Sequence, residues 1–284
     1  MELLITGAHG RLGAALVALL AARGHQVHAV DSDTFDVTDF PAARAYLQHA
    51  RPAWVIHTAA WTDVDGCARD PQKAVLINGH GAGNIATAAA EVGAGVLYIS
   101  SNEVFDGVGG RVYHEYDRAA PVNPYAYSKW VGEQAVLTSN PRAMIVRTAW
   151  LFAHGGKNFI QSILNAASAG NPLRVVTNEI GNPTYNDDAA AAVAALVEIG
   201  RCGVYHLVNE GHCSRYAFAR YALDQAGYGG VAIQPISAAE WPRASVPPEY
   251  TPLANTAGAM LGIRLRTWQA AVDAFLAKEG VLKA

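Results

Sequence analysis

The chain has 284 residues, of which 51% are hydrophobic and 16% are charged, and its formal net charge is −3. This length can bury a sizeable core and suits one large domain or two modest ones. The slightly acidic balance offers no basic surface for nucleic acid, so we expect no nucleic-acid partner. No apolar run is long enough to span a bilayer, and no basic leader precedes the first apolar segment. We therefore expect a cytoplasmic protein without membrane contact.

The cysteine and histidine contents argue against a disulfide-stabilised protein and against a metalloprotein. The three cysteines, Cys67, Cys202 and Cys213, lie far apart and form no Cys-x-x-Cys motif. Reduced thiols are the simplest account of such spacing. The 10 histidines are scattered without the spacing of metal ligands, so we expect no metal site.

The chain opens with a predicted strand over residues 2–6, a glycine-rich turn, and a predicted helix over residues 12–22. Glycines in the pattern Gly-x-x-Gly-x-x-Gly between a strand and a helix let the backbone approach a pyrophosphate at the helix N-terminus. The turn therefore predicts a dinucleotide site. Its predicted cofactor contacts are Gly7, Gly10 and Gly13, with His9 as a variable loop residue beside the cofactor.

The second predicted strand, residues 26–30, ends at Asp31, 18 residues after Gly13. An acidic side chain at this point takes the hydroxyls of the adenosine ribose. No Arg or Lys follows directly to hold a 2′-phosphate, so NADH is slightly favoured over NADPH. Arg11 offers an alternative place for a 2′-phosphate within the phosphate loop. Asp36 and Val37 are predicted to lie beside the adenine, with an ordinary turn as the alternative role for Asp36.

Strands and helices continue to alternate through the first half of the chain. The predicted elements are helix 41–50, strand 54–57, helix 73–92 with Asn78 early in it, strand 95–100, a helix after Asn123, and strand 144–148. This rhythm predicts an α/β fold with a Rossmann-type, doubly wound parallel sheet. Its ligand is expected at the carboxyl ends of the strands, where Ser101 and Tyr125 both fall. Small residues after the third strand, at Ala59 and Ala60, also indicate close approach to a ligand.

The helix after Asn123 carries the residues with the clearest chemical use. Asn123 is a good N-cap and Pro124 suits the first helical position. Tyr125 and Lys129 stand four residues apart and so share one face, whereas Tyr127 points elsewhere. An ammonium beside a phenol favours the phenolate, which lowers the phenol pKa from about 10 and allows proton transfer at neutral pH. An ordinary surface tyrosine and a solvated lysine explain this pair alone equally well.

The second half is less regular. Its predicted elements are helix 158–169, strand 173–176, a turn at 181–184 that caps a helix ending at 199, strand 203–208, helix 215–226, strand 231–236, a proline-rich loop at 242–252, and an amphipathic helix at 268–277. We expect residues 1–150 with 184–209 to form an NAD(P)-binding Rossmann domain. Residues 151–183 with 210–284 are expected to form a smaller C-terminal α/β substrate-binding region.

Several motifs occur together in a known order. The glycine turn, the run Ser-Ser-Asn-Glu-Val-Phe-Asp-Gly at 100–107, and Tyr125-x-x-x-Lys129 resemble the extended short-chain dehydrogenases/reductases. Finer motifs at residues 59–65, 147–152, 181–184 and 203–207 resemble the dTDP-4-dehydrorhamnose reductases within that group. The resemblance runs from residue 2 to about residue 276.

The resemblance implies hydride transfer from NADH or NADPH to C4 of a 4-keto-6-deoxy sugar on a nucleoside diphosphate. It implies that Ser101 holds the ketone oxygen, that Tyr125 donates the proton, and that Lys129 binds the nicotinamide ribose and lowers the pKa of Tyr125. The resemblance also implies that Arg11 and Leu12 line the pyrophosphate with the three glycines. Further implied cofactor residues are Ala59, Ala60, Trp61 and Asn78, the last with a structural role or a place in a proton relay. The implied substrate contacts are Asn102 and Trp150, followed by Val64 and Asp65.

Two departures from the family pattern bear on the substrate. The family's Ser-Thr-Asp-Tyr is Ser-Ser-Asn-Glu at residues 100–103, and its Arg-Pro stretch is replaced at 246–253 by a segment that lacks the arginine and contains Glu249. We therefore expect a pocket less suited to a diphosphate.

Two alternative functions remain open from the sequence. One is reduction of a smaller, non-nucleotide ketone or aldehyde, and the other is a non-catalytic NAD(P)-binding subunit like the regulatory subunit of methionine adenosyltransferase. We expect a monomer or a homodimer.

Overall fold

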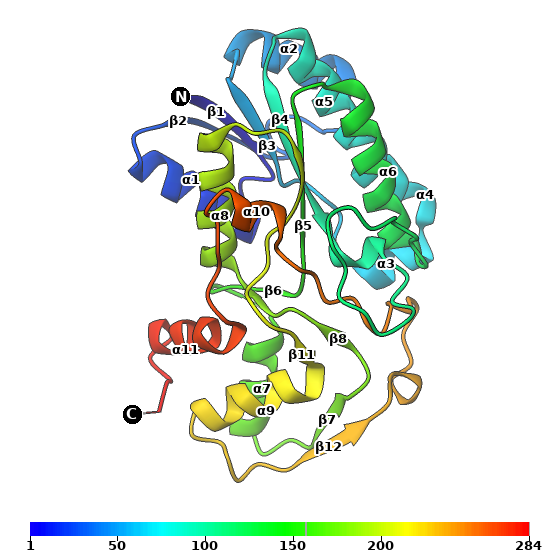
Figure 1. Cartoon of the computed structure of the whole chain (residues 1–284), viewed down its shortest axis with the longest axis vertical. Helices are drawn as coiled ribbons and strands as arrows, with labels where there is room; N and C mark the ends of the chain where they lie inside the picture. The colour runs from blue at the N-terminus through cyan, green and yellow to red at the C-terminus, as the bar shows by residue number, and fades with distance from the viewer. Residues whose placement is uncertain (157, 284) are drawn as a thin grey trace.

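The computed structural model describes residues 1–156 and 158–283, and its centre is a parallel six-stranded sheet in the upper half of Figure 1. The strand order is β10-β5-β4-β3-β1-β2, so the chain reverses direction across the sheet between β1 and β3. The predicted α/β, doubly wound fold is therefore confirmed. The strands are β1 (Glu2–Thr6), β2 (Gln26–Val30), β3 (Trp54–His57), β4 (Gly95–Ser101), β5 (Ala143–Thr148) and β10 (Gly203–His206).

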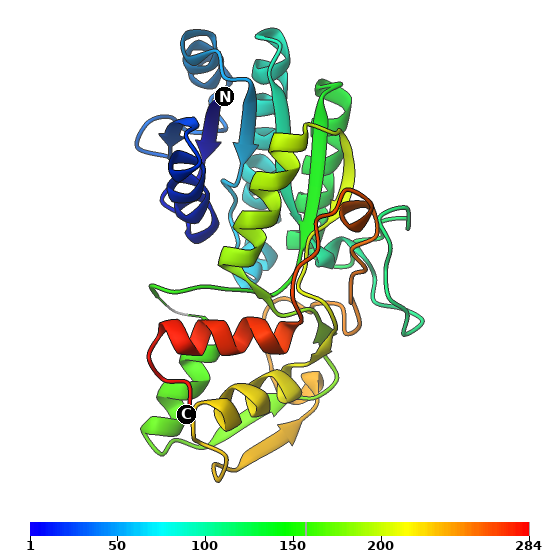
Figure 2. The same ribbon diagram turned by 60° about the vertical axis from the view of Figure 1, so that its left-hand side comes forward.

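Helices cover both faces of this sheet, as a parallel sheet requires. One face carries α1 (Arg11–Ala22) and α8 (Asn186–Ile199), and Figure 2 shows α8 lying across it. The other face carries α2 (Phe40–Ala50), α5 (Ala82–Glu91) and α6 (Pro124–Ser139). The two-residue period of β1 divides its side chains accordingly: Leu3 and Ile5 enter the first core and Leu4 enters the second.

The segment before β4 differs from the single helix predicted over 73–92. It forms α3 (Val64–Arg69), α4 (Pro71–Ala74), a π-helix (Val75–Gly81) and then α5. The π-helix and α6 pack so closely that neither contact glycine has room for a side chain. A Cβ on Gly79 would lie 2.8 Å from Cγ1 of Val131, and a Cβ on Gly132 would lie 2.4 Å from the carbonyl oxygen of Asn78. Helical periodicity in sequence does not reveal such a widened turn, because it is fixed by packing between the two helices.

The lower part of the molecule holds a second core. It is built by α7 (Phe159–Ser168), α9 (Arg215–Gln225), α11 (Trp268–Lys278) and the parallel pair β7 (Leu173–Val176) and β12 (Ile233–Ile236), as Figure 1 shows. The apolar stripe predicted for the last helix is buried in this core: Trp268, Ala271, Val272, Phe275 and Leu276.

Two segments of the second half form structure that differs from the elements predicted there. The turn predicted at 181–184 is wrong, because β8 (Ile180–Gly181) pairs with β11 (Cys213–Ser214) and β9 (Thr184–Tyr185) pairs with β6 (Leu151–Phe152). Farther on, the chain returns to the large sheet at α10 (Ala257–Met260), which contacts the edge strand β10. Ile263 and Leu265 then pack in the core shared by α1 and α8.

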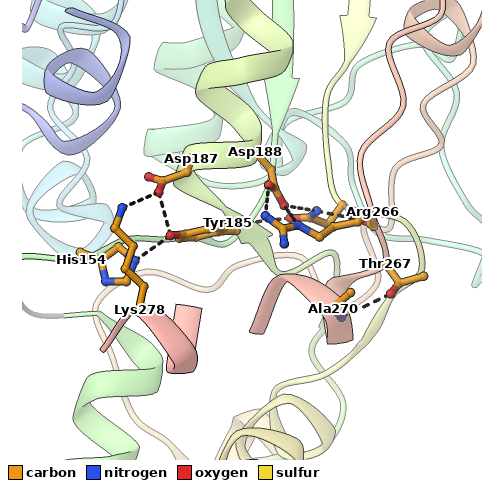
Figure 3. A network of polar contacts seen from close by, with 9 residues as sticks. His154, Tyr185, Asp187, Asp188, Arg266, Thr267, Ala270 and Lys278 are labelled. Atoms are coloured by element: carbon orange, nitrogen blue, oxygen red, sulfur yellow. Dashed lines mark hydrogen bonds and ion pairs between the residues drawn. The ribbon is translucent and has the colours of Figure 1, made fainter. Parts of the chain in front are cut away.

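A polar network ties α11 and the loop before it to the start of α8 (Figure 3). Asp188 accepts hydrogen bonds from Nε and Nη2 of Arg266 at 2.8 and 2.6 Å. Asp187 accepts from Nζ of Lys278 at 2.9 Å and from the hydroxyl of Tyr185 at 2.7 Å. Both carboxylates lie in the first turn of α8, where the helix dipole favours negative charge. The network therefore fixes the orientation of the second core against the sheet.

No helix among the described residues is long and apolar enough to cross a membrane. The same residues contain no cluster of side chains suited to holding a metal ion. Cys67, Cys202 and Cys213 are all free thiols.

Candidate active site

Two adjoining cavities open at the carboxyl ends of the central strands. The first, of about 430 Å³, is here called the loop cavity, and the second, of about 730 Å³, the central cavity. The walls of the loop cavity include Gly7, Gly10, Asp31, Asp36, Val37, Ala59, Ala60 and Trp61. The walls of the central cavity include His9, Arg11, Leu12, Gly13, Ala60, Ser101, Tyr125, Lys129 and Trp150. The structure thus gathers most of the predicted site residues at one edge of the sheet.

The glycine turn forms a tight cradle between β1 and α1. Gly7 has a left-handed φ of +68°, and a Cβ there would lie 2.6 Å from the backbone nitrogen of Ala59. A Cβ on Gly13 would lie 2.1 Å from the carbonyl oxygen of Gly7. Gly10 is the N-cap residue of α1 and has no side chain that could accept a hydrogen bond. The first N–H groups of α1 therefore face the cavities without a side-chain cap. A pyrophosphate is the group such a cradle fits.

Asp31 lies at the end of β2 and faces the loop cavity. Its carboxylate accepts backbone hydrogen bonds from His9 and Ser32, both at 2.8 Å. Burial alone would raise the pKa of Asp31, but these hydrogen bonds outweigh it and hold the pKa below its ordinary value. Asp36 also lines the loop cavity while its Oδ1 closes a turn by accepting from the backbone and hydroxyl of Thr38, both at 2.8 Å.

The helix start at Asn123 is confirmed. The Asn123 side chain accepts from the backbone N–H of Ala126 at 2.8 Å, and Pro124 occupies the first turn of α6. This start places Tyr125 and Lys129 in the wall of the central cavity, across from Ser101 at the end of β4. Lys129 and Ser101 are buried, and Tyr125 is half-buried.

The electrostatics of the Tyr125–Lys129 pair reverse one expectation. Burial raises the pKa of Tyr125, the negative charge of Glu103 raises it further, and a side-chain hydrogen bond with Ser101 opposes them only in part. Burial also lowers the pKa of Lys129 to about 7, so its ammonium is only about half protonated at neutral pH. The expected net lowering of the Tyr125 pKa is therefore not found in this structure, because desolvation and the Glu103 charge outweigh the effects that favour the phenolate.

Two neighbours hold the Lys129 ammonium in place. It lies over the ring of Tyr98, 4.1 Å from the ring centroid. Glu133, one turn farther along α6, favours the charged form of Lys129. Glu133 is itself paired with Arg147, whose Nε and Nη2 donate to its carboxylate at 2.9 and 2.7 Å. Because Glu133 is paired with Arg147, its carboxylate offsets only part of the cost of burying the Lys129 ammonium, and the Lys129 pKa falls.

Asn78 is fully buried on the π-helix, so it does not reach either cavity as a direct contact. Its Oδ1 accepts from the backbone N–H of Trp61 at 2.7 Å. Its Nδ2 donates to the carbonyl of Trp61 at 3.0 Å and to the hydroxyl of Ser128 at 2.9 Å. Asn78 therefore fixes the Trp61 loop against α6, which favours the structural role among those expected for it.

Trp150 and Thr148 mark the central cavity as a site built for a ligand. Trp150 has a left-handed φ of 43°, a conformation that costs a bulky residue on the order of 1–3 kcal/mol and is concentrated at functional sites. The hydroxyl of Thr148 is buried in the cavity wall without a hydrogen-bond partner among the described residues. Such a group costs free energy until an acceptor or donor reaches it. The motif at residues 147–152 includes Thr148, but the sequence alone assigned this residue no role of its own.

A third cavity, of about 290 Å³, shares the walls Asn102, Glu103, Trp150 and Arg215 with the central cavity. It is here called the arginine cavity. Val64 lines both, and Asp65 lines the arginine cavity while accepting from the backbone N–H of Ser245 at 2.9 Å. Nδ2 of Asn102 donates to the Thr251 hydroxyl at 2.6 Å. These two contacts tie α3 and the turn after β4 to the proline-rich loop.

The arginine cavity corrects the expectation of a pocket without arginine. Arg243, within the proline-rich loop, and Arg215, at the start of α9, both line it. Glu249 is exposed, is not part of the wall, and accepts a hydrogen bond from Asn178 at 2.7 Å. The two arginines were missed because no local motif marks them. They meet only through the fold.

Comparisons with known proteins agree with this geometry. The chain matches the family described as RmlD substrate binding domain over residues 1–281. It is 39% identical over 283 residues to the dTDP-4-dehydrorhamnose reductase of Mycobacterium tuberculosis, covering 97% of this chain and 92% of that protein.

Two solved structures share the whole fold. The crystal structure of a dTDP-4-dehydrorhamnose reductase from Clostridium acetobutylicum has a TM-score of 0.94 and 33% identity, covering 99% of this chain and 100% of that one. The crystal structure of the dTDP-4-dehydrorhamnose reductase from Bacillus anthracis in complex with NADP has a TM-score of 0.93 and 32% identity, covering 97% and 98%.

Proposed function

The chain belongs to the RmlD substrate binding domain family, and from that premise we propose that it reduces a sugar ketone with NADH or NADPH. The substrate we propose is a 4-keto-6-deoxy sugar linked to a nucleoside diphosphate, reduced at C4. The observation that carries this proposal is the convergence of Ser101, Tyr125 and Lys129 on one cavity beside the glycine cradle. A hydroxyl, a phenol and an ammonium are the groups needed to hold and protonate a carbonyl oxygen.

The described residues fit a nicotinamide dinucleotide. The pyrophosphate would lie against Gly7, Gly10 and Gly13 at the start of α1, and the adenosine beside Asp31 in the loop cavity. Lys129 would hold the nicotinamide ribose. When bound, the dinucleotide supplies the hydride that reduces the carbonyl carbon.

Each of the three polar residues has one task in this proposal. Tyr125 keeps its proton at neutral pH because burial raises its pKa, so it rests in the form that can donate. Ser101 donates a hydrogen bond to the ketone oxygen and keeps that oxygen beside Tyr125. Lys129, when protonated, stabilises the phenolate that remains on Tyr125 after proton transfer.

Two finer assignments extend the proposal. The charged Asp31 carboxylate would repel a 2′-phosphate, and Arg11 lines the central cavity but not the loop cavity, which supports a preference for NADH. The ratio of kcat/KM for the two cofactors measures this preference. We also assign cofactor binding to residues 1–150 with 184–209, and substrate binding to residues 151–183 with 210–284.

Replacement of Tyr125 by Phe tests the proposed proton donor. Because general acid catalysis contributes roughly 10²- to 10⁴-fold, kcat should fall by at least about 100-fold while NADH affinity stays within about twofold. Tyr127→Phe is the matched control, since this exposed tyrosine lies on the same helix but outside the cavity. A Tyr125→Phe variant with wild-type turnover would refute the assignment.

The substrate class is tested by comparing dTDP-4-keto-6-deoxy sugars with simple ketones and aldehydes in an NADH oxidation assay. The proposal predicts a much higher kcat/KM for the nucleotide-linked sugars. A preference for simple carbonyls would identify the smaller-ketone alternative. NADH binding without reduction of any carbonyl would identify a non-catalytic subunit.

A further inference from the structure

The arginine cavity holds two guanidinium groups that the proposed hydride and proton transfers do not use. Arg215 and Arg243 come from different elements, α9 and the proline-rich loop, and each side chain is 26% exposed. The guanidinium of Arg215 stacks on the Trp150 ring, 3.6 Å from its centroid. Since Arg215 and Trp150 line both this cavity and the central one, the two arginines lie directly beyond the place proposed for the sugar.

A single carboxylate holds the two arginines together. Glu179 is only 4% exposed, and one of its oxygens pairs with Nη2 of Arg243 while the other lies 3.7 Å from Nε of Arg215. Two guanidinium groups repel each other unless an anion lies between them. These contacts use one nitrogen of each guanidinium, and a guanidinium carries five N–H donors. Further donors on both groups can therefore serve a second anion.

Besides Glu179, three acidic residues line the cavity, and each of them accepts a hydrogen bond from a donor outside the arginine pair. Asp63 and Asp65 also line it, but their carboxylates accept backbone hydrogen bonds from Gly66 and Ser245. Glu103, a further acid in the wall, accepts a hydrogen bond from Nδ2 of Asn123 at 2.9 Å. The guanidinium donors are thus the groups in this cavity best suited to an incoming anion.

We propose that Arg215 and Arg243, oriented by Glu179, form the site for the diphosphate of the nucleotide-linked substrate. This proposal rests on the proposed function, because it places the diphosphate next to a sugar held at Tyr125. Planar guanidinium groups bind phosphate oxygens through paired N–H donors, and partial burial strengthens such contacts. Glu179 acts as a positioning residue, since its two carboxylate oxygens orient the two arginines.

Direct binding tests the site without requiring turnover. Affinities for dTDP and for inorganic pyrophosphate are measured by calorimetry on the wild type, Arg243→Gln, Arg243→Lys and Arg174→Gln. Loss of one charged hydrogen-bonding group should weaken binding of both probes about 10- to 100-fold in Arg243→Gln, with an intermediate loss in Arg243→Lys. Arg174 is the matched control because it is an exposed arginine on β7 outside the cavity.

The double variant Arg243→Gln/Glu179→Gln guards against a folding artefact, because it leaves no unpaired buried carboxylate. It should fold, bind NADH normally and still bind dTDP about 10-fold or more weakly. Wild-type affinity of this double variant for both probes would overturn the proposal, as would an equal loss of NADH affinity.

Steady-state kinetics separate this proposal from the proposed function. Arg243→Gln should raise KM for the nucleotide-linked sugar about 10-fold or more, with kcat changed less than about threefold. If the wild type reduces no nucleotide-linked sugar, the proposed function fails, while the dTDP and pyrophosphate affinities still decide whether the arginine site exists. An unchanged KM in an enzyme that does reduce the sugar would refute the arginine site alone.

Discussion

Replacement of Lys129 by Met should inactivate the enzyme and also change how its stability depends on pH. The Lys129 ammonium is buried, and its pKa falls from 10.5 to about 7 because burial penalises the charged form. Methionine keeps an unbranched side chain of similar length without a charge. The variant therefore removes a group that the folded state carries at a cost, while also removing the cation proposed to stabilise the Tyr125 phenolate.

The sign and size of the effect follow from the two pKa values of Lys129. Below pH 7 the lysine is protonated in both the folded and the unfolded state, so the native state carries the full penalty of about 5 kcal/mol. Between pH 7 and 10.5 the folded state loses the proton while the unfolded chain keeps it, so stability rises with pH. From pH 6 to pH 9 the gain from Lys129 is about 2 to 3 kcal/mol. A methionine in place of this lysine would give no such gain.

Urea denaturation at pH 6 and pH 9 measures this difference. The free energy of unfolding of Lys129→Met, relative to the wild type, should be about 2 to 3 kcal/mol higher at pH 6 than at pH 9. Taking the difference between the two proteins cancels the titration of all other groups. Lys73→Met is the control, because Lys73 is exposed and its replacement should have the same effect at both pH values. If Lys129→Met changes the free energy of unfolding by the same amount at pH 6 and at pH 9, the reasoning is refuted.

Two further substitutions test the cradle and the buried ion pair. Gly13→Ala would place a methyl 2.1 Å from the Gly7 carbonyl oxygen, so NADH affinity should fall by about 1–3 kcal/mol in a fluorescence titration; Gly230→Ala, where an added methyl meets nothing within 4 Å, should leave it unchanged. Glu133→Gln leaves the Arg147 guanidinium buried beside a neutral partner, and urea denaturation should show a loss of about 3–5 kcal/mol. A loss below about 1 kcal/mol would mean that Arg147 finds another acceptor, such as Ser100 or His206.

The features predicted well from sequence are those whose cause is local. The helix start at Asn123 and Pro124 needs only the N-cap hydrogen bond and the fixed φ of proline, and both lie within four residues. The cradle at Gly7 and Gly13 is set by contacts between a strand end and the first turn of the next helix. Short apolar strands separated by helical segments likewise determine the parallel sheet, because its inner strands β1, β3, β4 and β5 are buried on both faces.

The features missed from sequence depend on contacts between distant segments. The π-helix around Asn78 follows from its contact with α6, about 50 residues later in the chain. Arg215, Arg243 and Glu179 meet across three separate elements, and none belongs to a motif. One signal was available for α3, since Asp63 lies three residues before Gly66 and accepts from its backbone N–H. The pKa directions at Tyr125 and Lys129 needed the depth of burial, which no spacing rule supplies.

The raised pKa of Tyr125 is compatible with reduction, although a lowered one was expected. In the reductive direction the tyrosine must begin protonated, and burial ensures this across the neutral range. The proton then passes to an alkoxide, which is far more basic than a phenolate, so a high tyrosine pKa does not prevent transfer. A cation is needed only after the proton has left Tyr125, when the phenolate forms beside Lys129. A lysine pKa of about 7 would rise as that negative charge appears, so the buried pair favours the charged form of Lys129 at the step that uses it.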